Sequence, residues 1–335
     1  MRASVFMKRF LCTVLVLMLL ISSLVGCERT PDDGGIEIVC TVFPIYDWVD
    51  NLLGESDDVS LRLLVNRGTD PHSYTPTPTD IAAIHAADVL IYVGGESDTW
   101  VRDVLETVKN EDIKIISLLD MLGDRAQIEE TVEGMQCEDE DCHDHDHDHE
   151  GEHAESGAYD EHVWLSLKNA QMLCDGLADE LAAVLPDMAE QIDQNCDAYR
   201  EKIVSLNARF EETIAEKSEK LLIFADRFPF RYLIEDYSLD YFAAFSGCSA
   251  DSEATFETVV FLSEKLRESS AGALMILESS TRDLANTIIS NSGCEGVEII
   301  VMDSMQSINT RDINEGVTYL SIMEKNLAAI SAALK

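Results

Sequence analysis

Short apolar runs alternate with amphipathic helical segments along both halves of this chain. In the first half, strand-like runs such as IEIVCTVF (residues 36–43) and VLIYVGG (89–95) are separated by helical patterns. The second half repeats the arrangement, with KLLIFAD (220–226) and GALMILES (272–279) among its strand-like runs. Nearly continuous apolar strands that alternate with helices are typical of parallel sheets covered on both faces. The sequence therefore predicts an α/β fold of two lobes, each a mainly parallel sheet flanked by helices.

A continuous helical pattern over residues 186–217 separates the two halves. Its apolar residues recur every three or four positions, and neither glycine nor proline follows Pro186. This periodicity predicts one long helix, which would measure on the order of 45 Å, more than a single lobe needs. We therefore predict a rigid helix that joins an N-terminal lobe (residues 36–185) to a C-terminal lobe (218–335). The ligand site is expected in the cleft between the lobes, beyond the carboxyl ends of the strands.

The first residues are typical of a targeting segment. MRASVFMKRF carries three basic residues, and a long apolar run then leads to the sequence LVGC, which ends at Cys27. A basic start, an apolar middle and small residues at a cleavage point are features of a secretory signal, and LVGC looks like a bacterial lipobox. We predict a lipoprotein signal peptide over residues 1–26, lipidation of Cys27, and a polar tether over 27–35. The alternative is a transmembrane anchor.

Charge and motifs limit the possible functions. The formal net charge of −40 over 335 residues repels phosphates and attracts cations, so we expect no nucleic acid partner. The patterns GxSxG, GxxxxGKS/T, HExxH and GxGxxG are all absent, which argues against the common hydrolase, phosphate-binding and dinucleotide-binding sites. We predict that the protein is not an enzyme.

A histidine-rich stretch, CHDHDHDHEGEH (residues 142–153), lies within an acidic segment from about 128 to 160 that has no apolar periodicity. We expect this segment to be a mobile loop. Its imidazoles would bind metal weakly, but a tether near a cleft would give them an effective concentration on the order of millimolar. The alternatives are a solubilising acidic loop and a pH-sensitive one. The predicted accessory metal ligands are His143, His145, His147, His149 and His153.

Other candidate ligands follow from the expected strand ends. His72 lies in a loop after the strand-like run LRLLV, and His162 opens a helical segment beside two acids. In the second half, Asp226, Glu278 and Asp303 each close a strand-like run. Two imidazoles with one or two carboxylates suit Zn²⁺ or Mn²⁺. Each acid could instead cap the helix that follows it, and Glu278 could serve as the general base of a zinc-dependent hydrolase.

Four segments together resemble the cluster A-I metal-binding lipoproteins, the solute-binding subunits of zinc and manganese ABC importers. These segments are VFPIYDWV, GTDPHSYTPTPTDIAAIHAADVLIYVGG, DEHVWLSLKNA and MDSM…TYLSIMEKNL, and they span the chain after the signal in order. The resemblance implies two α/β lobes, one rigid linking helix and a single metal between the lobes.

The resemblance also implies a ligand set. It makes His72 a first ligand, His162 a second and Asp303 a carboxylate from the C-terminal lobe. Family members usually place a histidine or glutamate before an F-x-Y-F pattern. Here the sequence FADRFPFRYLIEDYSL puts Arg227 at that position, and a guanidinium cannot bind a cation. A shift of one residue presents Asp226, which is the predicted fourth ligand.

The resemblance implies that the protein captures Zn²⁺ outside the cell and delivers it to an ABC permease and its ATPase. It would be a monomer held by lipid at the outer face of the bacterial cell membrane. The richness in histidine favours zinc, whereas two carboxylates from the C-terminal lobe would favour manganese. Less favoured alternatives are a surface zinc-dependent hydrolase and a surface adhesin or zinc buffer without a permease. A rigid linking helix implies small, local closure around the metal.

Overall fold

The computed structural model describes residues 35–110, 112–136, 158–249, 253–269 and 271–335. The predicted signal peptide, the lipidation site Cys27 and the five accessory histidines lie outside these residues, and so these predictions stay predictions. Among the residues that the structure describes, no helix combines the length and the apolar character needed to cross a membrane. Residues Ile36–Lys335 form one unit by their internal contacts, and the following description concerns that unit.

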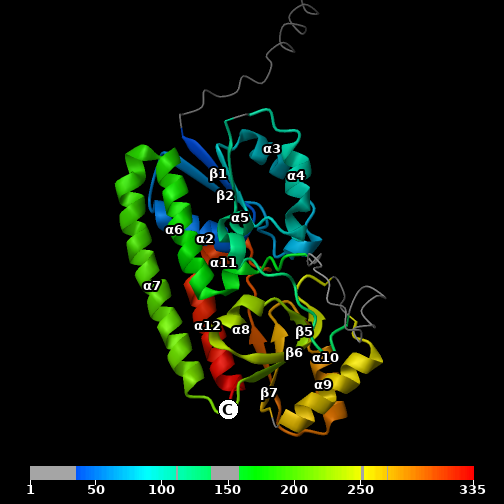
Figure 1. The fold of residues 1–335 in the computed structure, drawn as a ribbon. Coiled ribbons are helices and arrows are strands. Elements are labelled where there is room, and N and C mark those ends of the chain that lie inside the picture. The colour runs from blue at the N-terminus through cyan, green and yellow to red at the C-terminus, as the bar shows by residue number, and fades with distance from the viewer. Residues whose placement is uncertain (1–34, 111, 137–157, 250–252, 270) are drawn as a thin grey trace, which may run out of the picture. The chain divides into compact units, whose positions relative to one another are not determined.

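The N-terminal lobe is built on a four-stranded sheet in the order β2-β1-β3-β4, and every pair of neighbouring strands is parallel (Figure 1). Alternate residues of the central strand β1 face opposite layers of the lobe. Val39 packs with α3 and α4, whereas Ile38 and Cys40 pack with α2 and α6. The elements of this lobe are β1 (Ile36–Cys40), α2 (Phe43–Leu53), β2 (Val59–Leu63), α3 (Pro78–Ala86), β3 (Val89–Tyr92), α4 (Thr99–Leu105), β4 (Lys114–Ser117), α5 (Leu118–Leu122) and α6 (Leu167–Val184).

The C-terminal lobe repeats this topology. Its strands are also parallel, and their order β6-β5-β7-β8 corresponds to that of the first sheet. Helices α9 and α10 cover one face of the sheet, and α8 and α12 contribute to the core on the other. The elements are β5 (Leu221–Phe228), α8 (Arg231–Tyr237), β6 (Asp240–Ser246), α9 (Phe256–Ser269), β7 (Ala273–Leu277), α10 (Asp283–Ser292), β8 (Glu298–Met302), α11 (Thr310–Asn314) and α12 (Tyr319–Ala333).

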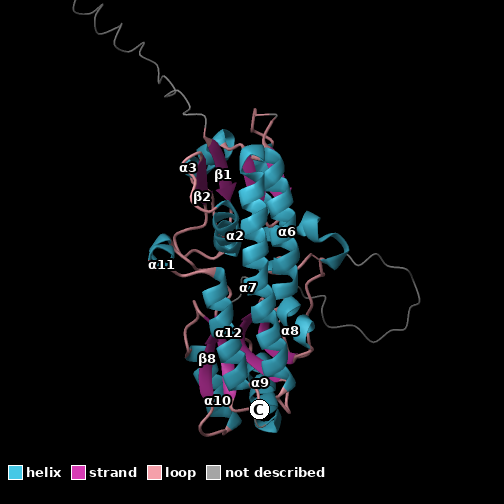
Figure 2. Ribbon diagram, turned by 90° about the vertical axis from the view of Figure 1, so that its left-hand side faces the viewer, coloured by secondary structure: helices cyan, strands magenta, loops and turns pink. Residues whose placement is uncertain are grey.

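Helix α7 (Ala189–Ala215) connects the lobes after a short 3₁₀ turn at Pro186–Met188. It packs against α2 and α6 of the first lobe and against α12 of the second (Figures 1 and 2). Its buried side chains form one stripe that runs from Ile192 to Ile214. The same hydrophobic core contains strand residues of both sheets, including Ile38 and Phe224. The predicted fold class, with two parallel-sheet lobes and one long linking helix, is confirmed.

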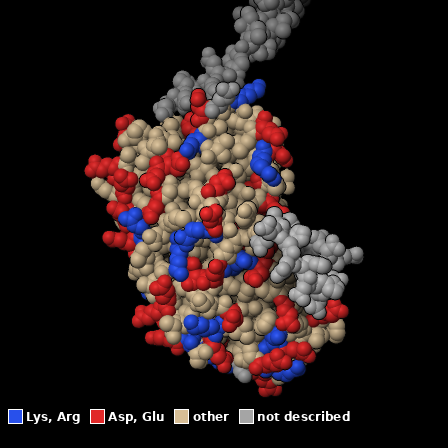
Figure 3. Space-filling view, in the orientation of Figure 1, with Lys and Arg blue, Asp and Glu red and all other residues tan. Residues whose placement is uncertain are grey.

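Loops from the two lobes also contact each other directly. Arg67 forms an isolated antiparallel bridge with Asn309, and the backbone N–H of Thr310 donates to the carbonyl of Asn66 at 3.0 Å. These contacts bring the loop after β2 against the loop after β8, so residues of both sheets can line one site. Acidic side chains are spread over the face shown in Figure 3, with Lys and Arg interspersed among them.

Candidate metal centre

His72 is held in a tight turn beyond the carboxyl end of β2. The turn is the 3₁₀ helix Pro71–Ser73, where proline occupies the first position and Asp70 caps the amino end. The Asp70 carboxylate accepts a hydrogen bond from the backbone N–H of His72 at 3.0 Å. Asp70 also forms an ion pair with Arg227 of β5. The cap and the ion pair therefore fix the His72 loop to the C-terminal lobe.

His162 is fully buried at the start of another 3₁₀ turn, Val163–Leu165. The Asp160 carboxylate accepts from the backbone N–H of His162 at 2.8 Å and lies 2.9 Å from its Nδ1. In the neutral ring, a proton on Nδ1 satisfies this contact and leaves the lone pair of Nε2 available to a ligand. A carboxylate that orients an imidazole in this way is the usual partner of a metal-binding histidine.

The two imidazoles face each other. Their Nε2 atoms lie 3.3 Å apart. In a tetrahedral zinc site with Zn–N bonds of about 2.0–2.1 Å, two ligand nitrogens are separated by about 3.3–3.4 Å. The side-chain nitrogen of Gln306, from the loop after β8, lies 3.0 Å from each Nε2. The spacing of the two histidines therefore fits one metal ion held between them.

Cys248 is the third residue of this cluster. One ligand atom from each of His72, His162 and Cys248 lies within 4.8 Å of the other two. No other group of three or more His, Cys, Asp and Glu residues meets this spacing in the part of the chain that the structure describes. Sequence reasoning missed Cys248, although it comes two residues after β6 and so obeys the same strand-end rule as His72. Gln306 was missed because amides are uncommon zinc ligands.

The two predicted carboxylate ligands lie outside this group and accept hydrogen bonds from their own chain. Asp226 accepts from the backbone N–H groups of Arg227 at 2.8 Å and Leu277 at 2.9 Å, and from the Ser280 hydroxyl. Asp303 accepts from the N–H of Met305 at 2.8 Å. Asp226 lies inside β5, which continues to Phe228, and it bonds to the end of β7, whereas Asp303 stabilises the turn after β8.

Glu278, the third acid predicted at a strand end, is used in the same way. Its carboxylate accepts from the N–H and the hydroxyl of Ser304 at 2.9 and 2.8 Å, and from the Ser307 hydroxyl at 3.1 Å. These bonds hold the loop that follows β8 and leads to Gln306.

Burial and neighbouring charge set the protonation of the site. Burial, followed by the neighbouring His162, lowers the pKa of His72 to about 3. Burial also acts to lower the pKa of His162, but the Asp160 carboxylate outweighs it and the pKa lies above its ordinary value. Burial, with Glu129 and Glu161, raises the pKa of the Cys248 thiol. Near neutral pH, His72 thus presents a neutral nitrogen, and the thiol keeps its proton unless a metal displaces it.

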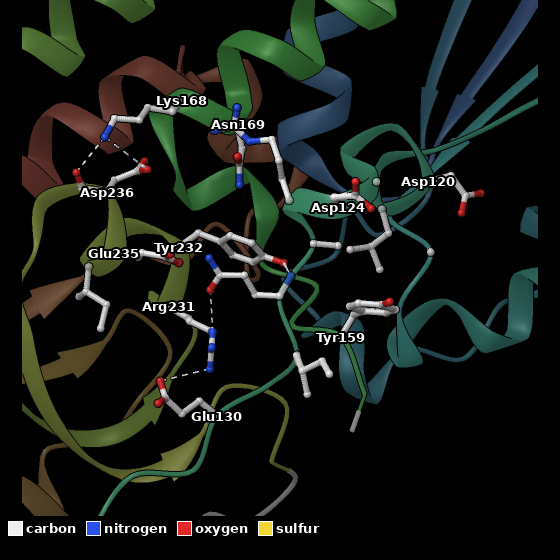
Figure 4. A pocket seen from close by; sticks show the side chains of 18 of the residues that line it. Asp120, Asp124, Glu130, Tyr159, Lys168, Asn169, Arg231, Tyr232, Glu235 and Asp236 are labelled. Atoms are coloured by element: carbon white, nitrogen blue, oxygen red, sulfur yellow. Dashed lines mark hydrogen bonds and ion pairs between the residues drawn. The ribbon is translucent and has the colours of Figure 1, made fainter. Parts of the chain in front are cut away.

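A separate cavity of about 1500 Å³ lies between α8 and the segment around Gln127. Figure 4 shows two ion pairs at the cavity wall: Arg231 with Glu130 at 3.2 Å, and Lys168 with Asp236. It shares no lining residue with the histidine cluster. This cavity therefore adds no metal ligand to the site.

A family model described as zinc-uptake complex component A, periplasmic, matches residues 38–333. The chain belongs to this family. The resemblance to solute-binding subunits of zinc importers is thereby confirmed. Curated relatives of this chain include the zinc-binding lipoprotein AdcA of Streptococcus pneumoniae, which is 33% identical over 92% of this chain. The chain spans only 58% of the length of that relative.

A further relative and a solved domain structure match over most of their own length. The high-affinity zinc uptake system protein ZnuA of Bacillus subtilis is 26% identical, with 89% of this chain and 88% of the relative covered. The Zn(II)-bound crystal structure of the ZnuA-like domain of Streptococcus pneumoniae AdcA matches with a TM-score of 0.69 and 29% identity. That match covers 90% of this chain and 99% of the domain.

Proposed function

We propose that this protein captures Zn²⁺ outside the cell and delivers it to an ABC permease and its ATPase. His72 and His162 are the central ligands of this proposal. The observation that carries it is the pair of Nε2 atoms 3.3 Å apart, with Asp160 holding one ring so that its lone pair faces the other. The names of the relatives, a zinc-binding lipoprotein and a zinc uptake protein, support zinc as the cargo.

The proposal includes the lipid anchor that the sequence predicts, with His72 and His162 as zinc ligands. Lipid on Cys27 would hold the protein at the outer face of the membrane, and the zinc would leave the site unchanged, without catalysis. Asp226 and Asp303 stay predicted ligands, to be decided by substitution. The core shared by both sheets and by α7 supports small local closure around the metal, because a wide rotation would break that packing.

Calorimetric titration with Zn²⁺ and with Mn²⁺ tests the proposal. We expect one tight zinc site and weaker binding of manganese, because imidazole nitrogen suits zinc. His72→Ala should remove the tight site. His85→Ala is the matched control, since His85 lies on α3 and contacts Thr107 away from the cluster. Tighter binding of manganese, or a tight zinc site that survives His72→Ala, would contradict the proposal.

Delivery requires a measurement in cells. Deleting the gene should slow zinc uptake under zinc limitation, and the wild-type chain should restore uptake where His72→Ala does not. Restoration by both chains would exclude the cleft as the source of the delivered ion.

The accessory histidines form a separate part of the proposal. Removing residues 137–153 should eliminate weak zinc binding and leave the tight site in place, because the tight ligands lie elsewhere in the chain. Loss of the tight site with these residues would instead assign it to the histidine-rich segment.

A further inference from the structure

We infer that Cys248 is the third protein ligand of the zinc site, so that the ion is bound by two imidazoles and a thiolate. This inference rests on the proposed function and deepens it, because it names the ligand that the C-terminal lobe contributes. On binding, the Cys248 thiol would lose its proton to solvent and form one Zn–S bond. The ligand set would then carry one negative charge.

The geometry of the loop after β6 brings the thiol to the histidines. Cys248 follows Gly247, which lies directly against the ring of His162. A Cβ at Gly247 would lie 2.9 Å from the carbonyl of Phe228 and 3.1 Å from Cε1 of His162. Only glycine allows this approach without movement of the neighbours. The ligand atoms of all three residues already lie within 4.8 Å of one another, and in a tetrahedral site sulfur and nitrogen ligands are about 3.5 Å apart.

Arg227 explains why the loop after β6 can supply a zinc ligand in place of β5. It stands where the family resemblance expects a metal-binding side chain. Its guanidinium pairs with Asp70 and donates to the carbonyl of Ser249 at 3.5 Å. Asp70 caps the His72 turn, and Ser249 is next to Cys248. Arg227 therefore ties together the two loops that carry His72 and Cys248, in place of binding the metal itself.

The side chain of Gln306 is independent evidence for a metal ion beside the two imidazoles. Its side chain is 5% exposed, its nitrogen lies 3.0 Å from both imidazole Nε2 atoms, and its oxygen has no hydrogen-bond partner among the described residues. Rotating the amide by half a turn exchanges these two atoms. The oxygen would then occupy the fourth position of a metal site, where it gains the partner that it now lacks.

The charge of the ligands suits a divalent ion, and the softness of the thiolate favours zinc. A thiolate leaves one net positive charge on the complex, and the buried Glu161 carboxylate lies 3.8 Å from both the Cys248 sulfur and Nδ1 of His72. Thiolate is a soft ligand that selects zinc over manganese, whereas carboxylates do the reverse. The assignment of Cys248 therefore implies rejection of manganese.

Zinc K-edge absorption on the full chain loaded with one equivalent of zinc tests the inference without depending on a substitution at the site. Cys137→Ser and Cys142→Ser remove the thiols beside the histidine-rich segment. We expect one sulfur neighbour at about 2.3 Å. A shell of nitrogen and oxygen alone would overturn the inference.

Substitution gives the second test. Cys248→Ser should lower zinc affinity by more than the roughly 10–100-fold that loss of an outer partner costs, and should remove the thiolate charge-transfer absorption of the Co²⁺-loaded protein. Cys294→Ser is the control, since Cys294 is also partly buried but lies beside Leu266. If affinity and spectrum survive Cys248→Ser while His72→Ala abolishes binding, the inference fails and the proposed function stands. If His72→Ala has no effect, the proposed function fails.

Discussion

Both lobes carry polar residues near the carboxyl-terminal edges of their sheets or at the starts of nearby helices, but these residues have different roles. On the first lobe, His72 and His162 each have a carboxylate that fixes the turn or the ring, and their Nε2 atoms point at a common centre. On the second lobe, Asp226 and Glu278 accept three hydrogen bonds each from their own chain. The sheets share one strand order, so the difference lies in the loops.

This comparison shows that a position at a strand end does not by itself decide whether a side chain can bind a metal. A carboxylate near a strand end meets backbone N–H groups of neighbouring strands and loops, as Asp226 and Glu278 do, and it stabilises them as a cap does. An imidazole has two nitrogens, so one can bond to the protein while the other remains available. Cys248 and Gln306 are side chains of the second lobe that the turns do not use, which supports their proposed place in the site.

Removing an imidazole should have the largest effect on zinc affinity. In His162→Ala the site loses a fully buried ligand, and we expect affinity to fall by more than about 100-fold, beyond the cost of losing an outer partner. Zinc should then no longer raise the melting temperature, because stabilisation by a ligand depends on its concentration relative to Kd. Calorimetry and thermal melting, each with and without zinc, measure both. A zinc-dependent shift of the melting temperature that persists in His162→Ala would mean that His162 is not a zinc ligand, and the contrast between the two lobes would fail.

Removing the carboxylate behind that imidazole should have a smaller effect. Asp160→Asn keeps an oxygen near Nδ1 but removes its charge, so we expect a loss of about 10–100-fold in zinc affinity. The fold should survive, since the amide oxygen can still accept from the N–H of His162. Unchanged affinity would mean that the Asp160 carboxylate serves the turn alone, as Glu278 does on the second lobe.

The acid of the second lobe should matter least for zinc. Asp226→Asn weakens bonds to Leu277 and Ser280, and we expect it to lower the free energy of unfolding by about 1–3 kcal/mol. Zinc affinity should change by less than about fivefold, equivalent to about 1 kcal/mol. Asp303→Asn is the parallel variant. If either loses as much affinity as His162→Ala, that carboxylate is a ligand and the contrast between the two lobes disappears.

The sequence predicted the fold well because its signals were local and redundant. Each apolar run of β1, β3, β5 and β7 is a strand, and the uninterrupted periodicity after Pro186 became α7. Such patterns depend on spacing along the chain, which the sequence shows directly.

The site was harder to predict because its residues meet through contacts that are distant in sequence. The rule that ligands follow strand ends selected His72 and three acids, and His162 was selected because it opens a helical segment beside two acids. Neither signal could show that backbone N–H groups occupy Asp226. Cys248 obeyed the same rule, yet nothing in the sequence FSGCS distinguishes it from a structural thiol. Gln306 is recognisable only from its unpaired oxygen, which requires the fold.

The buried Asp98 of the first lobe makes part of the comparison between the lobes dependent on pH. Asp98 accepts from the N–H groups of Val93 at 2.7 Å and Gly94 at 3.3 Å, much as Asp226 does for Leu277. Burial, opposed by the bond from Val93 and assisted by Glu161, raises its pKa from 3.8 to about 7. The folded protein therefore keeps this proton over a pH range in which the unfolded chain has released it.

The direction of the pH effect on stability follows from the linkage between proton binding and folding. Between about pH 4 and pH 7 the folded state binds more protons at Asp98, so its contribution to stability is present in acid and is lost as pH rises through the folded pKa. Asp98→Asn should flatten this part of the profile, by an amount on the order of 1 kcal/mol for each pH unit. Urea unfolding of both proteins at several pH values measures it, and comparing the two cancels the contribution of other acids. Parallel profiles would mean that Asp98 is ionised when folded.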